Sequence, residues 1–292
     1  MAALGSGFDA DAEDDEEVTP GSLRWWLPLD NQTHKQAAQG IFDKIVAALS
    51  SEEAQKLSVA ESESRTSETL DLTYGDISFE AVGQLVAAAD PPEGAVFYDL
   101  GSGSGRALLA AALLANFSRC VGVEVLRGLH EAAERAADQY AAIRGHPLVA
   151  AGCTPLVCDR MADVVEFVHE DLFRVPVFGA HIVYCCCATW PPAIMSRLAT
   201  KLAAELEDGS KVLTVGNYMP ATVTLPEVGV VRFAEVWNGL AQCAWGQEVL
   251  VVHEVRSVSA RAGAGLRRDK MEQWYASVAN PQESWPPRPA RC

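Results

Sequence analysis

The chain has 292 residues, and 49% of them are hydrophobic, so it is long enough to bury a sizeable core. Its formal net charge of -16 argues against a protein that grips nucleic acid over a broad face. The sequence has no apolar run that predicts a membrane span and no secretory signal pattern, so we expect an intracellular chain.

The two ends of the chain differ in composition from its centre. Seven acidic residues and no basic one lie between Asp9 and Glu17, which is typical of a solvated, disordered tail. We expect an acidic tail over 1–22, a helical extension over 23–70, a main domain over 71–258 and a second tail over 259–292.

Helical and extended patterns alternate along the chain. Predicted helices span 34–49, 77–89, 107–115, 126–143 and 191–205, and 50–69 reads as a solvated Ser/Glu-rich connection that is helical in part. Predicted strands span 95–100, 119–124, 164–169, 181–186, 211–215, 230–237 and 245–255, with an irregular insertion over 147–162. This alternation predicts an α/β fold with a parallel sheet and an antiparallel terminal hairpin at its edge.

A glycine-rich turn follows the first predicted strand. Asp99 precedes Gly101, Gly103 and Gly105, and a helix is predicted to follow Arg106, an arrangement that cradles nucleotides in α/β proteins. A dinucleotide-binding motif needs its third glycine at the position of Arg106, so the chain does not match that motif. It does not match a P-loop either, because the Gly-Lys-Ser/Thr of that motif is absent. The spacing resembles the first motif of S-adenosyl-L-methionine (AdoMet) methyltransferases, and Asp99 suits the cationic amino end of that ligand.

Two further acids follow predicted strands. Glu124 ends the second strand about 20 residues after the glycine turn, where such domains place a carboxylate for ribose hydroxyls. Asp171 follows the third strand, at the sheet edge where ligands bind, beside Leu172. In a methyltransferase, Asp171 would accept from the adenine amino group and Leu172 would pack on the ring.

The eight cysteines do not follow a metal-binding pattern. Cys185, Cys186 and Cys187 are consecutive, so their side chains alternate between the two faces of a strand, and no Cys-x-x-Cys pair occurs. We therefore expect buried free thiols and no metal site.

The stretch before the first strand carries a family resemblance. Leu72 to Glu80 reads Leu-Thr-Tyr-Gly-Asp-Ile-Ser-Phe-Glu and resembles the Tyr-Gly-Glu-Thr-Ser-Phe-Glu signature of the disruptor-of-telomeric-silencing family, the non-SET histone-lysine methyltransferases. The resemblance continues through the glycine turn and the later acids to Trp237. It implies a class I (Rossmann-like) AdoMet methyltransferase domain over 71–258, AdoMet as cofactor, and a histone or nucleosome as partner. It favours the nucleus as compartment, with the cytoplasm as the alternative.

The resemblance also implies individual site residues. The implied cofactor contacts are Tyr74, Gly75, Asp76, Ile77, Phe97, Asp99, Gly101, Ser102, Gly103, Gly105, Arg106, Glu124, Asp171 and Leu172. The implied acceptor channel contains Tyr74, Cys185, Trp237 and Trp245, with Tyr184 and Trp190 as further candidates. The alternative for Trp237 and Trp245 is a place in the hydrophobic core. Asp76-Ile77 replaces the family's Glu-Thr, and Cys185-Cys186 replaces its Asn-Asn, so a weaker hydrogen-bonding group stands near the transferring methyl.

Two other classes of function stay open. A class I methyltransferase for a non-histone protein or a small molecule would keep the cofactor motifs and lose the channel asparagines, as this chain does. A non-catalytic scaffold is disfavoured because the glycines and all three motif acids are present. An apolar channel disfavours a charged amine, so no general base is assigned.

Overall fold

The computed structural model describes residues 32–47, 50–64, 75–143, 164–226, 229–243 and 245–258. Its strands are β1 (Val96–Leu100), β2 (Arg119–Glu124), β3 (Val165–His169), β4 (Ile182–Cys186), β5 (Lys211–Val215), β6 (Thr222–Leu225), β7 (Gly229–Cys243) and β8 (Gly246–Ser257). Its helices are α2 (Gln32–Val46), α3 (Ser51–Ser64), α4 (Phe79–Ala89), α5 (Arg106–Leu114), α6 (Arg127–Ile143) and α9 (Pro192–Glu205). The predicted tails and the insertion over 147–162 lie outside the described residues.

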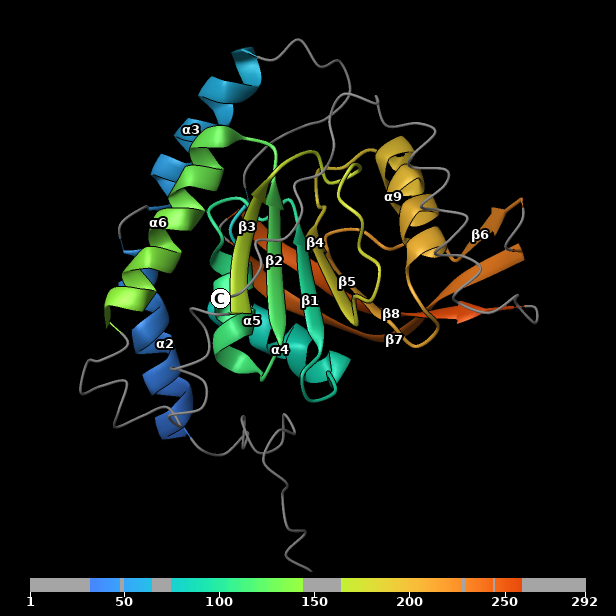
Figure 1. The fold of residues 1–292 in the computed structure, drawn as a ribbon, viewed down its shortest axis with the longest axis horizontal. Helices are drawn as coiled ribbons and strands as arrows, with labels where there is room; N and C mark the ends of the chain where they lie inside the picture. Colours follow the sequence, from blue (N-terminus) through green and yellow to red (C-terminus); the bar gives the residue numbers. More distant parts are fainter. Residues whose placement is uncertain are drawn as a thin grey trace, which may run out of the picture.

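The strands form one sheet in the order β3-β2-β1-β4-β5-β8-β7-β6 (Figure 1). The first five strands are parallel, and β8 runs antiparallel to both β5 and β7. This confirms the predicted α/β fold with a parallel sheet and an antiparallel hairpin. The short strand β6 was not predicted; it pairs with β7 and takes the sheet edge expected for the hairpin.

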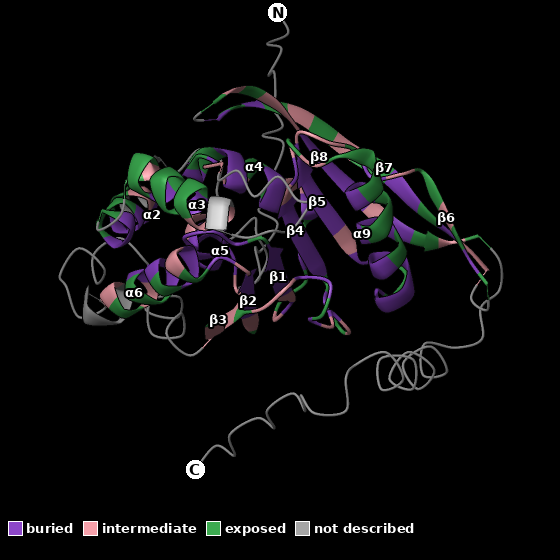
Figure 2. Ribbon diagram, turned by 90° about the horizontal axis from the view of Figure 1, so that it is seen from above, coloured by how far each residue is buried: buried purple, intermediate pink, exposed green. Residues whose placement is uncertain are grey.

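Two buried clusters cover the two faces of the sheet. One joins α2, α4 and α5 to the sheet, and the other joins α9 to the opposite face. Figure 2 shows the central strands buried between these layers, while the far end of the β7–β8 hairpin carries exposed residues. None of the described helices is both long and apolar enough for a membrane crossing.

Helix α3 occupies a segment that the sequence predicts to be mostly a solvated connection. Its side chains show only weak helical amphipathicity, but Ala54 is fully buried against Leu126 and Leu129. The carboxylate of Glu61 accepts the backbone N–H groups of Arg127 and Gly128, at 2.8 and 3.0 Å. These tertiary contacts, and not local periodicity, hold the helix beside the start of α6.

Candidate functional site

A cavity of about 470 Å³ lies at the carboxyl edge of β1, β2 and β4. This is the edge where α/β sheets bind ligands, and the volume lies in the range of small-molecule sites. The predicted site residues that line it are Gly75, Asp76, Ile77, Asp99, Gly101, Ser102, Gly103, Arg106, Glu124, Asp171, Leu172 and Trp245. Chain segments far apart in sequence therefore meet in one pocket.

The glycine turn forms the floor of the pocket. Gly101, Gly103 and Gly105 have φ of 85°, 54° and 82°, values that side chains rarely allow. A Cβ on Gly105 would also lie 2.6 Å from the Phe167 ring, so this glycine packs against β3 and does not line the pocket. The turn brings bare backbone to the cavity wall at the start of α5.

Asp99 is the least satisfied polar group of the site. It is 1% exposed, and neither carboxylate oxygen has a hydrogen-bond partner among the described residues. Burial, followed by the charge of Glu124, raises the pKa of the Asp99 carboxyl well above its usual range; the nearby Leu108 backbone N–H, which does not meet hydrogen-bond geometry, offsets this only in part. A cationic ligand group beside Asp99 would reverse this penalty.

Glu124 is buried at the end of β2 and anchored by backbone amides. Its Oε2 accepts the Gly103 N–H at 2.8 Å, and its Oε1 accepts the Leu126 N–H at 2.7 Å. Burial raises the pKa of the Glu124 carboxyl, and these amides offset part of the rise. The carboxylate is held rigidly between the glycine turn and α6, with further acceptor capacity on both oxygens.

Asp171 lies in the turn after β3. Its Oδ1 accepts the Phe173 N–H at 2.9 Å, and its own N–H donates to Glu170 Oε1 at 2.8 Å. One carboxylate oxygen therefore supports the turn. Leu172 is buried beside it, and both residues line the cavity.

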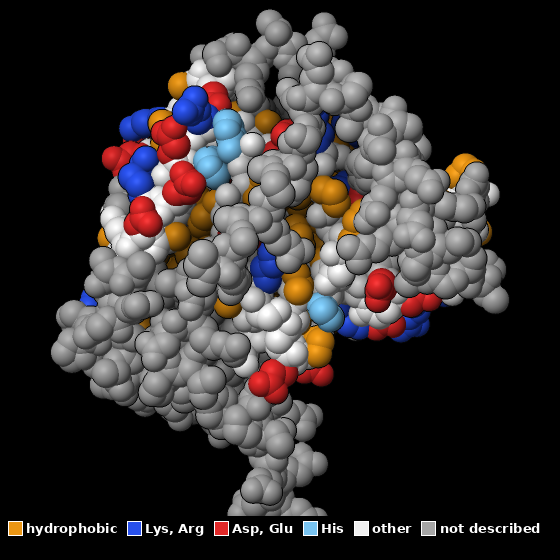
Figure 3. All heavy atoms as spheres, viewed as in Figure 1, with side chains coloured by type: hydrophobic (Ala, Val, Ile, Leu, Met, Phe, Trp, Pro, Cys, Tyr) orange, Lys and Arg blue, Asp and Glu red, His pale blue; other side chains and the backbone are white. Residues whose placement is uncertain are grey.

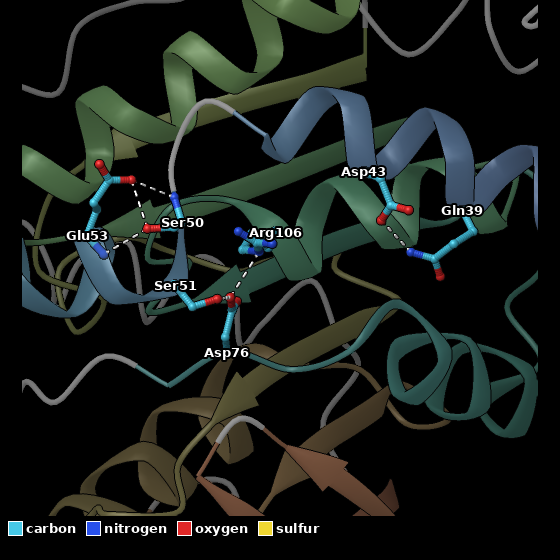
Figure 4. Close-up of polar contacts among 7 residues, drawn as sticks. All are labelled: Gln39, Asp43, Ser50, Ser51, Glu53, Asp76 and Arg106. Atoms are coloured by element: carbon cyan, nitrogen blue, oxygen red, sulfur yellow. Dashed lines mark hydrogen bonds and ion pairs between the residues drawn. The ribbon is translucent and has the colours of Figure 1, made fainter.

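Asp76 connects the glycine turn to the N-terminal helices, as Figure 4 shows. Its Oδ2 lies 3.0 Å from Arg106 Nε and also accepts the Ser51 hydroxyl of α3. The Arg106 guanidinium lies 6.0 Å from the centre of the Phe42 ring of α2. Asp76 and Arg106 thus line the pocket and also tie α3 to the start of α5.

Trp245 at the tip of the β7–β8 hairpin closes the pocket against Gly75. A Cβ on Gly75 would lie 2.7 Å from the Trp245 ring, so only glycine permits this packing. The indole Nε1 donates to Glu248 at 2.7 Å, and the side chain is 41% exposed. Trp245 is therefore a fixed aromatic wall at the mouth of the pocket.

Strand β4 supplies the wall across from the glycine turn. Tyr184 and Cys186 line the cavity, and the loop after the strand adds Ala188, Thr189 and Trp190. Burial raises the pKa of the Cys186 thiol, so this thiol is protonated and not a nucleophile. Asn217 fixes the loop, because its side-chain amide donates to the carbonyls of Cys187 and Trp190 at 2.6 and 3.3 Å.

Four predicted site residues are not brought to the pocket by the structure. Phe97 lies in the core beside Phe117, with ring centres 5.2 Å apart, and Gly105 packs on β3. Cys185 points to the opposite face of β4, because strand side chains alternate, and Trp237 packs against the core beside Gly239. Tyr74 lies outside the described residues.

Sequence reasoning missed several lining residues. Gln55 comes from α3, Val125 and Leu126 come from the link between β2 and α6, and Leu129 comes from the first turn of α6. None of them belongs to a chemical motif. The only signal for Leu126 and Leu129 was their apolar spacing on a predicted helix.

The residues of this pocket fit AdoMet. The unpartnered Asp99 carboxylate suits its ammonium group, Glu124 suits the ribose hydroxyls, and the second oxygen of Asp171 suits the adenine amino group. The glycine turn lets the ligand approach the backbone closely. Nowhere in the described ranges do three His, Cys, Asp or Glu side chains gather as a metal site would require.

Several solved structures are similar to this chain. An RNA methyltransferase from Salinibacter ruber, in complex with S-adenosyl-L-homocysteine, is 22% identical, over 64% of this chain and 97% of that chain, with a TM-score of 0.42. The B. subtilis tRNA methyltransferase TrmK is 15% identical, over 70% of this chain and 83% of that chain, with a TM-score of 0.41. A SAM-dependent methyltransferase from Thiobacillus denitrificans, also with S-adenosyl-L-homocysteine, is 25% identical over 48% of each chain, with a TM-score of 0.34. No curated protein matches the chain significantly.

One protein family matches most of the chain directly. The family described as "Histone methylation protein DOT1" matches residues 53–236, from within α3 to β7. This segment is more than half of the 292 residues, and it includes all the pocket residues from Gly75 to Leu172. The chain therefore belongs to the DOT1 family and is an AdoMet-dependent methyltransferase.

Proposed function

We propose that this protein methylates a lysine side-chain amine of a protein, and that the acceptor is a histone. The observation that carries the proposal is the match of residues 53–236 to a histone methylation family, in a chain whose pocket is lined by Asp99, Glu124 and Asp171. A second support is the aromatic character of the pocket wall beside the cofactor residues, which Trp190 and Trp245 line.

AdoMet supplies a methyl group already activated by a sulfonium, so the protein's contribution is alignment and exclusion of water. Asp99 would hold the ammonium of the cofactor, and Glu124 would orient the ribose. The aromatic wall would surround the acceptor. An apolar wall disfavours a charged ammonium and so favours the neutral amine, which would lose its proton to water before transfer. The amine nitrogen would then bond the methyl carbon as the carbon–sulfur bond breaks, with S-adenosyl-L-homocysteine as the leaving group. No side chain is assigned as general base.

Charge supports a basic acceptor. The chain has 39 acidic and 23 basic residues, and a net charge of this sign attracts basic polypeptides and steers their encounter. On the face of α3 and α6 that Figure 3 shows, basic and acidic side chains are interspersed. A histone acceptor would further place the protein in the nucleus, which remains part of the proposal.

A non-histone acceptor is the second candidate, and one observation favours it. Cys186 lines the pocket where the family carries a carboxamide, so the acceptor is aligned differently from the family pattern. The acceptor would then be another protein or a small molecule with the same nucleophilic group. The cofactor half of the site is unaffected by this choice.

The test is transfer of labelled methyl from AdoMet to nucleosomes, free histones and a cell lysate, with the modified residue located by mass spectrometry. Gly103→Arg serves as the inactive variant because Gly103 lines the pocket with φ of 54°. Gly179→Arg is the matched control, since Gly179 has φ of 74° and open space around its Cβ position, away from the cavity.

We expect label on a histone lysine with the wild type and Gly179→Arg, and none with Gly103→Arg. Label confined to a lysate component would reject the histone and select the second candidate. Absence of transfer to any acceptor, together with tight AdoMet binding, would reject both acceptor assignments.

A further inference from the structure

Buried polar atoms without partners point to a ligand in this structure. Among the described residues, five side chains carry such atoms: Asp99, Ser102, His130, Tyr184 and Thr214. Three of these, Asp99, Ser102 and Tyr184, line the same cavity. Buried polar groups normally find hydrogen-bond partners, so their concentration here indicates groups that a bound molecule satisfies.

Tyr184 is held rigidly at this cavity. It lies directly opposite Asp99 in the pairing of β4 with β1, and its side chain faces the same side of the sheet as Cys186. Its ring stacks on Phe97, with centres 6.5 Å apart and an interplanar angle of 18°. The residue is only 3% exposed, so the position of its hydroxyl is set by the core.

The Tyr184 hydroxyl does not contribute to the packing of the core. A phenylalanine would fill the same space and would avoid burying a donor without an acceptor. Burial raises the pKa of the Tyr184 phenol well above its usual range, and the nearby Cys186 and Asp99 add to the rise. The group therefore stays protonated and keeps an unpartnered O–H donor on a residue that lines the cavity.

The charges of Asp99 and Arg106 indicate which ligand group the Tyr184 hydroxyl binds. Asp99 accepts hydrogen bonds only, so it suits the ammonium of an amino acid and repels its carboxylate. Arg106, the pocket guanidinium, is ion-paired with Asp76. Tyr184 is the neutral donor beside Asp99, and an amino-acid ligand presents its ammonium and carboxylate on one carbon.

We propose that Tyr184 is a positioning residue for the cofactor: its hydroxyl donates a hydrogen bond to the carboxylate of the amino-acid end, while Asp99 binds the ammonium. The inference rests on AdoMet dependence and not on the identity of the acceptor. It gives the cofactor a two-point attachment that fixes the sulfonium between the glycine turn and β4.

The experiment compares two ligands on two variants of the full chain by isothermal titration calorimetry. The ligands are S-adenosyl-L-homocysteine and its decarboxylated analogue, which keeps the ammonium and lacks the carboxylate. The variants are Tyr184→Phe and Asp99→Asn. Tyr218→Phe is the matched control, because Tyr218 is 49% exposed and outside the cavity.

Tyr184→Phe should weaken the binding of S-adenosyl-L-homocysteine about tenfold, or ~1.4 kcal/mol, and leave the affinity for the analogue unchanged. Asp99→Asn should weaken the binding of both ligands. The melting temperature of ligand-free Tyr184→Phe should equal or exceed that of the wild type, because no bond is lost in the free protein. In turnover, the KM for AdoMet should rise while kcat stays within about twofold.

Equal affinity of Tyr184→Phe and wild type for S-adenosyl-L-homocysteine would overturn the inference, as would an equal loss for both ligands. A wild type that binds neither AdoMet nor its product would instead overturn the proposed function. The two failures are therefore distinguishable in one set of titrations.

Discussion

Replacing Asp99 by asparagine should stabilise the free protein and weaken its hold on the cofactor. The side chain is 1% exposed with both oxygens unpartnered, and burial together with Glu124 raises its pKa. Ionisation is therefore costly in the folded state. Asparagine keeps the shape of the side chain and removes its charge. The free energy of unfolding of the ligand-free variant should therefore rise by the cost of keeping an unpaired carboxylate buried.

The size of the effect follows from the burial of the group. A buried polar group without a partner costs ~1–3 kcal/mol, and more when charged. We expect Asp99→Asn to raise the free energy of unfolding by about 1–3 kcal/mol at neutral pH. In a domain of this size, each kcal/mol raises the melting temperature by ~2–4 °C. Loss of the charge-assisted bond to the ammonium should weaken S-adenosyl-L-homocysteine by about 10- to 100-fold.

The pH dependence has a definite sign. Because the folded pKa of Asp99 is raised, the folded state binds more protons than the unfolded state. Its contribution to stability falls as pH rises from the unfolded value of about 3.9 through the folded pKa. The advantage of Asp99→Asn should vanish below that unfolded value and grow with increasing pH. Ligand affinity of the wild type should increase with pH over the same interval.

Urea denaturation at a series of pH values measures the stability difference. Calorimetry in two buffers of different ionisation enthalpy measures the proton released on binding, which should be smaller for Asp99→Asn. A variant that is less stable than wild type at every pH, or that releases as many protons on binding, would refute the reasoning.

Three further substitutions test packing around the site. Gly216→Ala should cost about 2–5 kcal/mol in urea unfolding, because Gly216 has φ of 88° and the new Cβ would lie 2.3 Å from the Ala188 backbone. Glu61→Gln should cost ~0.5–2 kcal/mol and weaken cofactor binding in calorimetry, since it removes the anionic cap at the start of α6. Lys201→Met should cost about 3–5 kcal/mol in urea unfolding by leaving the buried Glu205 carboxylate without its 2.7 Å partner.

Each of these has an internal control. Gly209→Ala has the same backbone strain, with φ of 90° and no atom near its Cβ position, so a loss equal to that of Gly216→Ala would exclude the clash. Glu52→Gln on the exposed side of α3 should leave binding unchanged. A double change of Lys201→Met with Glu205→Leu should recover most of the loss, and no recovery would mean that packing, not charge, sets the cost.

The cofactor side of the pocket is readable from the sequence because its residues act locally. A strand with an acid as its penultimate residue, followed directly by a glycine turn, fixes Asp99, Gly101 and Gly103 at one sheet edge. Parallel neighbours then bring Glu124 and Asp171 to the same edge. The motifs alone therefore predict the positions of these five residues, without knowledge of the sheet register.

The acceptor side of the pocket depends on strand phase and hairpin register, which local sequence patterns do not predict. The alternation of consecutive cysteines was predictable, but which of Cys185 and Cys186 faces the cavity depends on the phase of β4 against its neighbours. A bulge between Glu235 and Trp237 shifts the register of the hairpin. Trp237 then packs on the core, and the turn beyond Cys243 carries Trp245 to the pocket.

The position of α3 has a thermodynamic consequence. Gln55 lines the cavity, Ser51 donates to Asp76, and Glu61 caps α6, although all three precede the main domain expected from residue 71. A ligand that contacts Gln55 binds more tightly when α3 is docked, so part of its binding free energy stabilises the docking of the helix. At 100 times its dissociation constant a ligand adds at most ~2.7 kcal/mol to that docking. The smallest unit that keeps full affinity therefore begins before Ser51, and protection of α3 from proteases reports how much of the protein is loaded with cofactor.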